Sequence, residues 1–199
     1  MKVAIIKYNA GNICSVINAM RRIGIEPVLS DNREELSNAD RIIFPGQGEA
    51  SNTLSFLREK GLDHIIKNLK QPVLGICIGQ QLLCKNSEEG QTDCLNVFDG
   101  VTVRKFIPQQ HEDKIPHMGW NSLSHLSSPL FKGIEEGEYV YFVHSYYVPV
   151  NKYTIAESNY IHPFSAAMHK GNFFSTQFHP EKSGKTGERI LKNFIELDL

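Results

Sequence analysis

Apolar positions in the first 76 residues alternate between runs typical of buried strands and spacings typical of amphipathic helices. Short apolar runs at 3–7, 25–29, 41–44 and 72–76 predict strands. Helical spacing predicts one helix that ends near Gly24 and helical structure from Leu54 to Leu69. Strands that alternate with helices predict a parallel sheet covered on both faces, with functional sites beyond the carboxyl ends of its strands.

The pattern changes at about Leu95. From there to Gln177, short β-type runs are divided by Gly, Pro, Asn and Ser, at 101–103, 139–143, 154–156 and 166–168. These runs predict an antiparallel extension of the sheet and a smaller secondary sheet. Residues 187–199 predict a closing helix. We therefore expect one α/β domain over residues 1–199, with a mixed, largely parallel sheet, flanking helices and a smaller antiparallel β extension.

The composition of the chain is that of an ordinary globular domain and does not identify a function. The chain is 41% hydrophobic and 22% charged, which is ordinary for a soluble globular domain. A net charge of −1 gives no general attraction for nucleic acid or for a membrane surface. We find no secretory signal and no Cys-x-x-Cys pair, so we expect a cytoplasmic protein with reduced thiols and no zinc site. Cys14 and Cys84 are expected to be core thiols.

Residues 75–79, Gly-Ile-Cys-Ile-Gly, join a predicted strand to a predicted helix through residues 79–85. Glycines two positions before and after Cys77 let strand and helix cross closely while the cysteine takes a strained conformation. The helix that follows would direct its positive end at the sulfur and favour the nucleophilic thiolate. The alternative is a buried cysteine in a glycine-rich strand end.

A second candidate lies 102 residues later, where the predicted strand 173–178 leads into His179-Pro180-Glu181. Residues i and i+2 of an extended chain face the same side, so His179 and Glu181 can point together. A carboxylate there would orient the imidazole and support its protonated form. The alternative is a surface His-Glu pair, but together with Cys77 the pattern predicts a Cys-His-Glu triad.

Acyl transfer also needs N–H donors for the developing oxyanion. The backbone amide of Ile78 is one candidate, and the turn Pro45-Gly46-Gln47-Gly48, near Gln47, is the other. An ordinary strand-to-helix turn remains the alternative for this segment. Gln81 could reach substrate from the helix after Cys77, or simply lie on the helix surface. Residues 182–187 have the wrong spacing for a phosphate-binding loop.

The Cys77 turn, the His-Pro-Glu segment and the Pro-Gly-x-Gly turn, in their order along the chain, resemble those of the class I glutamine amidotransferases. The similarity covers essentially the whole length and implies a flavodoxin-like α/β fold. Three further segments are similar to the glutaminase subunits of imidazole glycerol phosphate synthase, at 8–12, 116–121 and 142–146. Pro-His-Met-Gly-Trp, from Pro116, is the specific marker, because many relatives share the cysteine turn.

The resemblance implies hydrolysis of L-glutamine to glutamate and ammonia in histidine biosynthesis, with no metal or other cofactor. Ammonia would pass to a separate (βα)₈-barrel cyclase subunit, the partner in a heterodimer, which makes imidazole glycerol phosphate and an aminoimidazole carboxamide ribotide. By match, Cys77 is the nucleophile, His179 the base and Glu181 its orienting carboxylate. The residues that would hold glutamine are Gln81, Glu89, His144, Ser145 and Tyr146. Those at or near the cyclase contact are Asn12, Met118, Trp120, Tyr141 and Lys182.

The chain departs from this pattern at three positions. Gln47 stands where the family usually has valine, Gln80 where it has methionine, and Ile78 where it has leucine. Three rival functions also fit parts of the pattern: a glutaminase for another pathway such as purine or pyridoxal phosphate synthesis, a cysteine peptidase, and a non-catalytic binding module. The segment from Pro116 to Asn121 argues against the first and the triad against the last.

Overall fold

A computed structural model describes residues 1–8, 11–46 and 48–198. Its centre is a seven-stranded sheet in the order β11-β12-β13-β4-β3-β1-β2, in which β2, β1, β3, β4 and β13 run parallel. Strands β12 and β11 continue the sheet in antiparallel pairing. The bounds are Val3–Ile6 (β1), Val28–Ser30 (β2), Arg41–Phe44 (β3), Val73–Ile76 (β4), Thr154–Tyr160 (β11), His162–Lys170 (β12) and Phe173–Thr176 (β13). The expected largely parallel sheet with an antiparallel extension is confirmed.

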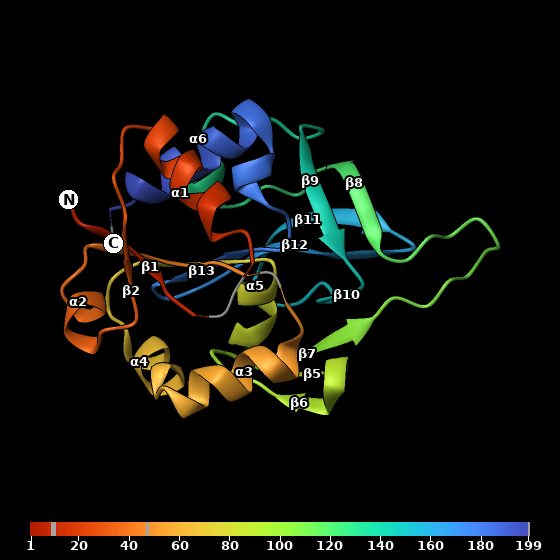
Figure 1. The fold of residues 1–199 in the computed structure, drawn as a ribbon. Coiled ribbons are helices and arrows are strands. Elements are labelled where there is room, and N and C mark those ends of the chain that lie inside the picture. Colours follow the sequence, from red (N-terminus) through yellow and green to blue (C-terminus); the bar gives the residue numbers. More distant parts are fainter. Residues whose placement is uncertain (9–10, 47, 199) are drawn as a thin grey trace.

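Helices cover both faces of this sheet (Figure 1). On one face lie α1 and α6, and on the other α3, α4 and α5, with α2 beside the β2 edge. The bounds are Ile13–Arg22 (α1), Arg33–Ser37 (α2), Ala50–Glu59 (α3), Leu62–Asn68 (α4), Ile78–Leu83 (α5) and Gly184–Ile195 (α6). Because each helix buries one apolar stripe against the sheet, two hydrophobic cores form, one on each face.

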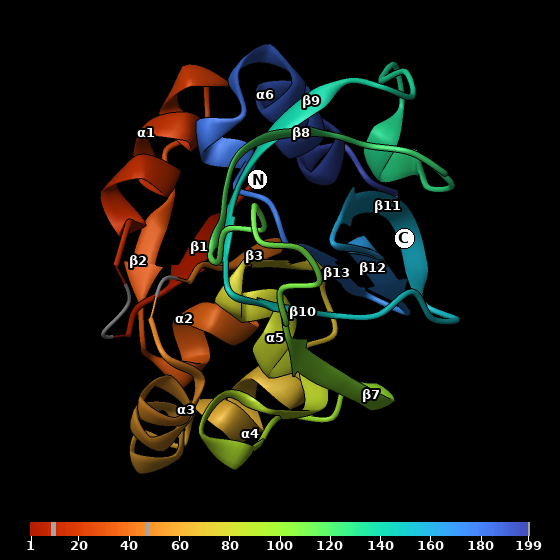
Figure 2. The same cartoon turned by 90° about the vertical axis from the view of Figure 1, so that its right-hand side faces the viewer.

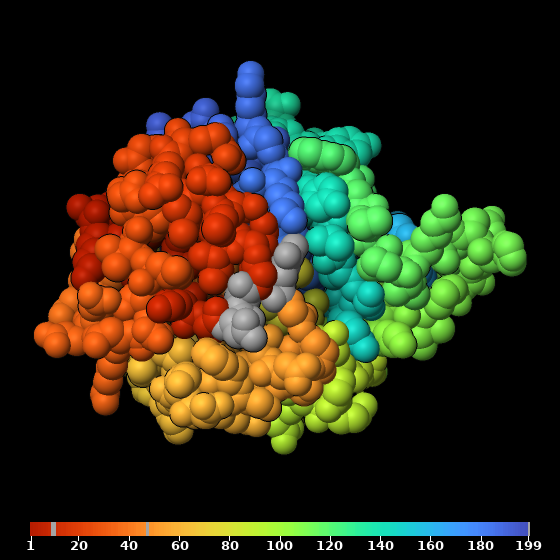
Figure 3. Space-filling view, viewed as in Figure 1, coloured from red at the N-terminus to blue at the C-terminus, as the bar shows by residue number. Residues whose placement is uncertain are grey.

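Two smaller β structures flank the main sheet. One has the order β10-β7-β5-β6 and the other is the antiparallel pair β8-β9. Their bounds are Cys84–Ser87 (β5), Thr92–Asp93 (β6), Phe98–Lys105 (β7), His117–Ser122 (β8), Tyr139–His144 (β9) and Tyr146–Tyr147 (β10). Figure 2 shows β8 and β9 crossing the molecule between α6 and β10, and the connection from β7 to β8 projects from the body in Figure 3. Short 3₁₀ turns occur at Glu89–Gln91 (η1), Pro129–Phe131 (η2) and Pro180–Lys182 (η3).

Several predicted boundaries were wrong for local reasons. The helical stretch 54–69 is two helices, because the chain turns at Gly61 with φ of 65°. The helix after Cys77 ends at Leu83, and Cys84 begins β5, where it pairs with Phe98. Strand β2 starts three residues later than predicted.

The predicted core position of Cys14 was also wrong. The four cysteines are free, and Cys14 is exposed because it lies beside, and not on, the buried stripe of α1 formed by Val16, Ala19 and Met20. Cys84 is wholly buried, as expected. In the described part of the chain, no helix is long and apolar enough to cross a membrane.

Candidate active site

Cys77 sits at the carboxyl end of β4, the junction that the sequence singles out. Its φ of 54° and ψ of −106° are rare for a residue with a side chain, and its N–H donates to the Thr176 carbonyl at 2.7 Å. A Cβ built on Gly79 would lie 2.4 Å from the Phe44 carbonyl oxygen, and one on Gly75 would lie 2.9 Å from Leu83 Cδ1. Gly75 is therefore required for β4 and α5 to approach, as predicted, whereas Gly79 is required for α5 to approach the neighbouring strand β3.

The helix that follows Cys77 is shorter than expected. It has six residues, and its first turn is closed by the N–H groups of Gln80 and Gln81, which donate to the Cys77 carbonyl at 3.0 and 3.3 Å. A helix of under two turns has a small macrodipole, so the sulfur depends more on neighbouring side chains than on helix α5.

His179 and Glu181 meet directly behind the cysteine turn. His179 Nδ1 donates to Glu181 Oε1 at 2.7 Å, and both side chains are 1% exposed. The pair is formed by a turn and not by continued strand, because β13 ends at Thr176 and Pro180 begins η3. Asn12 Nδ2 also donates to Glu181 Oε1, at 2.5 Å, so the carboxylate is held from two sides.

The neighbours of His179 change the pKa of its imidazole ring. Burial by itself lowers the pKa of His179, but the neighbouring Cys77 sulfur and the Glu181 carboxylate outweigh it and raise that pKa to about 10. These neighbours favour the imidazolium form of the ring, beside the sulfur. Its other nitrogen, Nε2, is buried and has no hydrogen-bond partner among the described residues. It is thus available to exchange a proton with a bound molecule.

A pocket of about 300 Å³ opens in front of Cys77. Seven of the sequence-predicted site residues line it: Cys77, Ile78, Gln81, Glu89, His144, Ser145 and Tyr146. They come from the β4–α5 junction, η1 and the end of β9 with β10, which the fold brings to one place. Gln81 faces this pocket, whereas the neighbouring Gln80 donates to the Ser165 carbonyl at 3.0 Å on the sheet side. The predicted oxyanion residue Gln47 lies outside the described residues.

Glu89 is the carboxylate at the pocket wall. Its Oε2 accepts a hydrogen bond from the Ala50 N–H at the start of α3, at 2.7 Å. Burial, aided by the charge of Glu49, raises the pKa of Glu89, while the Ala50 amide opposes the shift. A half-buried carboxylate of this kind fits a cationic group that enters the pocket.

Two buried histidines form a directional hydrogen-bond chain beside the pocket. The Tyr146 carbonyl can only accept, so His144 Nδ1 donates to it, at 2.7 Å. His144 Nε2 then accepts from His117 Nδ1 at 3.0 Å, and His117 Nε2 accepts from Asn121 Nδ2 at 3.4 Å. This order requires both rings to be neutral. Burial lowers the pKa of His117 to about 4 and that of His144 to about 3.

The residues predicted at a partner contact lie around strand β8 and η3. Met118 and Trp120 are 67% and 55% exposed, and the Trp120 ring meets the Tyr141 ring edge-on at 6.1 Å between centroids. Lys182 is half-buried in η3. Asn12 instead reaches inward to Glu181, so it connects this edge of the molecule to the candidate triad.

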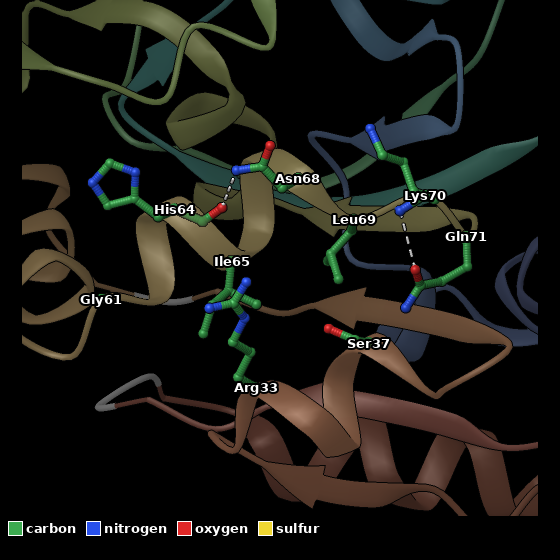
Figure 4. A pocket seen from close by; sticks show the side chains of 9 residues that line it. All are labelled: Arg33, Ser37, Gly61, His64, Ile65, Asn68, Leu69, Lys70 and Gln71. Atoms are coloured by element: carbon green, nitrogen blue, oxygen red, sulfur yellow. Dashed lines mark hydrogen bonds between the residues drawn. The ribbon is translucent and has the colours of Figure 1, made fainter.

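A larger cavity, of about 420 Å³, lies between α2 and α4 (Figure 4). Its lining includes His64 and Asn68 of α4 and Gln71, which precedes β4. That is the opposite end of β4 from Cys77, and none of the predicted site residues lines this cavity. The smaller pocket is therefore the candidate site, because the strained cysteine and the polar groups converge there.

Sequence reasoning gave no individual role to several residues of the site. Gly48 and Val143, named only as members of longer segments, line the pocket with Pro116, and His117 supports it through His144. Gln177, buried just after the end of β13, donates from Nε2 to Cys77 Sγ at 3.6 Å. Ser175 and Thr176 precede it in the same segment, so a polar side chain at position 177 did not stand out from its neighbours.

Comparison with known proteins identifies the family of the chain. The model of the glutamine amidotransferase class-I family matches residues 4–197. The chain is 62% identical over 197 residues to the imidazole glycerol phosphate synthase subunit HisH of Bacteroides thetaiotaomicron, covering 99% of this chain and 100% of that protein. It is 45% identical over 201 residues to the HisH subunit of Salmonella typhimurium, covering 99% and 100%.

Solved structures agree at the level of the fold. A crystal structure described as a glutamine amidotransferase superposes with a TM-score of 0.74 at 18% identity, covering 98% of each chain. A glutamine amidotransferase from Thermotoga maritima superposes with a TM-score of 0.63 at 17% identity, covering 98% of this chain and 83% of that one. With a strained cysteine, a buried His-Glu pair and a family match from residue 4 to residue 197, this chain belongs to the class-I glutamine amidotransferases.

Proposed function

We propose that the chain is the glutaminase subunit of an imidazole glycerol phosphate synthase and that it hydrolyses L-glutamine to glutamate and ammonia. The observation that carries the proposal is Cys77, held at positive φ in front of a 300 Å³ pocket with the buried His179–Glu181 pair behind it. The 62% identity to a HisH subunit supports the specific pathway, histidine biosynthesis, and the cytoplasm as its place.

The reaction follows from the groups at hand. Cys77 Sγ attacks the carboxamide carbon, and the carbonyl electron pair moves to oxygen. The imidazolium of His179 gives the Nε2 proton to the departing nitrogen, so the C–N bond breaks and ammonia leaves a thioester. Water then attacks the thioester as His179 takes its proton, and glutamate leaves as the C–S bond breaks. Glu181 keeps the imidazole oriented in both half-reactions.

The oxyanion formed in each half-reaction needs N–H donors. The Ile78 amide follows the nucleophile directly and is the first donor we propose. The turn around Gln47 supplies the second, and its glycine Gly46 packs closely on Ile78, because a Cβ there would lie 1.8 Å from Ile78 Cγ2. That contact supports a turn seated against the nucleophile.

The pocket suits a free amino acid. We assign the Glu89 carboxylate to the α-ammonium group of glutamine, because it is the negative group of the pocket lining. Gln81 and the segment His144, Ser145 and Tyr146 lie along the rest of the substrate. The pocket volume is at the lower end for small-molecule sites, which favours a compact substrate over a folded polypeptide.

The partner we propose is the cyclase subunit, bound as a heterodimer at the surface formed by Met118, Trp120, Tyr141 and Lys182. Met118 and Trp120 are large apolar side chains left in solvent, which is typical of an interaction surface. Asn12 lies beside the same edge and bonds to Glu181. Transfer within a complex also keeps ammonia from being protonated in bulk water.

The test is glutamine turnover by Cys77→Ala, with the cyclase present. The variant should lose hydrolysis and keep its melting temperature, whereas Cys14→Ala, which removes the exposed thiol of α1, should keep both. A glutamine-like electrophile should label Cys77 first. Burial raises the pKa of Cys84, and it raises that of Cys94 to about 12, which leaves few reactive thiolates at those positions. Retained turnover without Cys77, or cleavage of peptides in place of glutamine, would refute the proposal.

A further inference from the structure

The Gln177 carboxamide links two functional side chains that are far apart in sequence. Its Oε1 accepts from Gln81 Nε2 at 2.9 Å, and its Nε2 lies 3.6 Å from Cys77 Sγ. The side chain is 0% exposed, and the Gln177 backbone N–H donates to the Ala166 carbonyl at 2.8 Å. The carboxamide is thus held in place and exchanges no hydrogen bond with solvent.

The network fixes which end of the carboxamide faces the sulfur. Gln81 Nε2 also donates to the Tyr146 carbonyl, at 3.1 Å, and a carbonyl oxygen can only accept. The atom of Gln81 on that side is therefore nitrogen. Gln177 must meet this nitrogen with its oxygen, so its own N–H group points at Cys77.

We infer that Gln177 is a positioning residue for the nucleophile: its N–H holds Cys77 Sγ on the pocket side and favours the thiolate, while its oxygen orients Gln81 toward substrate. A donor to sulfur stabilises the anion more than the neutral thiol, because hydrogen bonds to charged acceptors are the stronger ones. The single carboxamide therefore couples attack by Cys77 to the placement of the substrate contact. This inference rests on the proposed glutaminase function.

The chain offers a matched control in Gln80. It is also 0% exposed, and its carboxamide is satisfied at both ends, by the Ser165 carbonyl at 3.0 Å and the Ser175 hydroxyl at 3.1 Å. Those bonds lead away from the pocket. Methionine has a similar length and volume to glutamine but has no N–H donor, so Gln177→Met and Gln80→Met remove one buried carboxamide each.

The experiment measures alkylation of Cys77 by iodoacetamide from pH 5 to pH 10 on the full-length chain, with the modified peptide quantified by mass spectrometry. In Gln177→Met we expect the pH of half-maximal alkylation to rise by about one unit, a roughly tenfold shift from thiolate to thiol. Gln80→Met should keep the wild-type profile. Two titratable side chains, His179 and Tyr8, face Cys77, and two more, Glu181 and His144, lie behind His179. All four are the same in both variants.

Thermal melts of both variants accompany the titration, and Gln177→Asn gives a second measurement if methionine does not fold. Asparagine keeps a carboxamide but is one methylene shorter, so it too should shift the profile upward. An unchanged profile in the folded Gln177 variants, or an equal shift in Gln80→Met, would overturn the inference. Glutamine turnover by the unmodified chain is measured separately, so a failure of the proposed function is distinguished from a failure of this role.

Discussion

Mild acid should destabilise this fold through two histidines that are buried as neutral rings. His117 and His144 have folded-state pKa values of about 4 and about 3, lowered mainly by burial from the ordinary 6.5. Between those values and pH 6.5 the unfolded chain binds protons that the folded chain excludes. Their contribution to stability is therefore complete above pH 6.5 and is lost as the pH falls.

The size of the effect follows from the pKa of His117. From pH 6.5 to pH 5, exclusion of one proton should lower the free energy of unfolding by about 1.5 kcal/mol, and His144 should contribute a similar amount. Carboxylates with ordinary pKa values titrate mainly below this window, and Glu89, whose pKa burial raises, takes up its proton in the folded chain first and so opposes the loss. His179 does not contribute to this loss. Its folded-state pKa is raised to about 10, so the stability it adds is lost only as the pH rises from 6.5 toward about 10.

Urea denaturation at half-unit steps from pH 7 to pH 5 measures this slope. His117→Gln keeps an amide donor for His144 but does not titrate, so the loss of stability over the window should shrink by roughly half. His64→Gln is the control, because the His64 side chain is 85% exposed and meets solvent in both folded and unfolded chains. If His117→Gln retains the full slope, the buried rings are not the cause and the neutral hydrogen-bond chain is wrong.

Two other predictions concern turnover and assembly. Glu181→Gln should keep a kcat for glutamine at least about tenfold higher than that of His179→Ala, because the amide oxygen can still accept from His179 Nδ1. Steady-state kinetics of both variants measure this difference. If Glu181→Gln were the slower variant, Glu181 would take a direct part in proton transfer. Trp120→Ala should weaken cyclase binding by about 2 kcal/mol, since exposed aromatic anchors dominate many interfaces. Because Trp120 is 55% exposed, the melting temperature should barely move, and a large fall in melting with unchanged affinity would make it a structural residue.

The sequence predicted the cysteine turn because its constraint is visible as missing side chains at Gly75 and Gly79. Gly75 lets β4 approach α5, and Gly79 lets α5 approach the main chain of β3 at Phe44. The end of α5 was mispredicted because it is decided elsewhere. Cys84 leaves the helix to pair with Phe98 of β7, and residues 79–85 carry no sign of that distant strand.

The same contrast between local signals and distant partners separates the His179–Glu181 pair from its supports. His179 and Glu181 are two residues apart, so their pairing could be expected, although the 3₁₀ turn that forms it was not. Gln177 acquires its place from Gln81 and Cys77, which lie 96 and 100 residues earlier in the chain. Gln177 follows two other polar residues, Ser175 and Thr176, so nothing in the segment 173–178 singles it out or indicates its partners.

The contact between Gly79 and the Phe44 carbonyl has a consequence for how this protein can diverge. The atoms that bring helix α5 against strand β3 belong to the main chain, and every amino acid supplies the same carbonyl at position 44. Core side chains on either face of the sheet can therefore be substituted during evolution without a change in the position of Cys77 Sγ. Substitutions should accordingly be poorly tolerated at Gly79 and better tolerated at Phe44, although Phe44 is the larger residue.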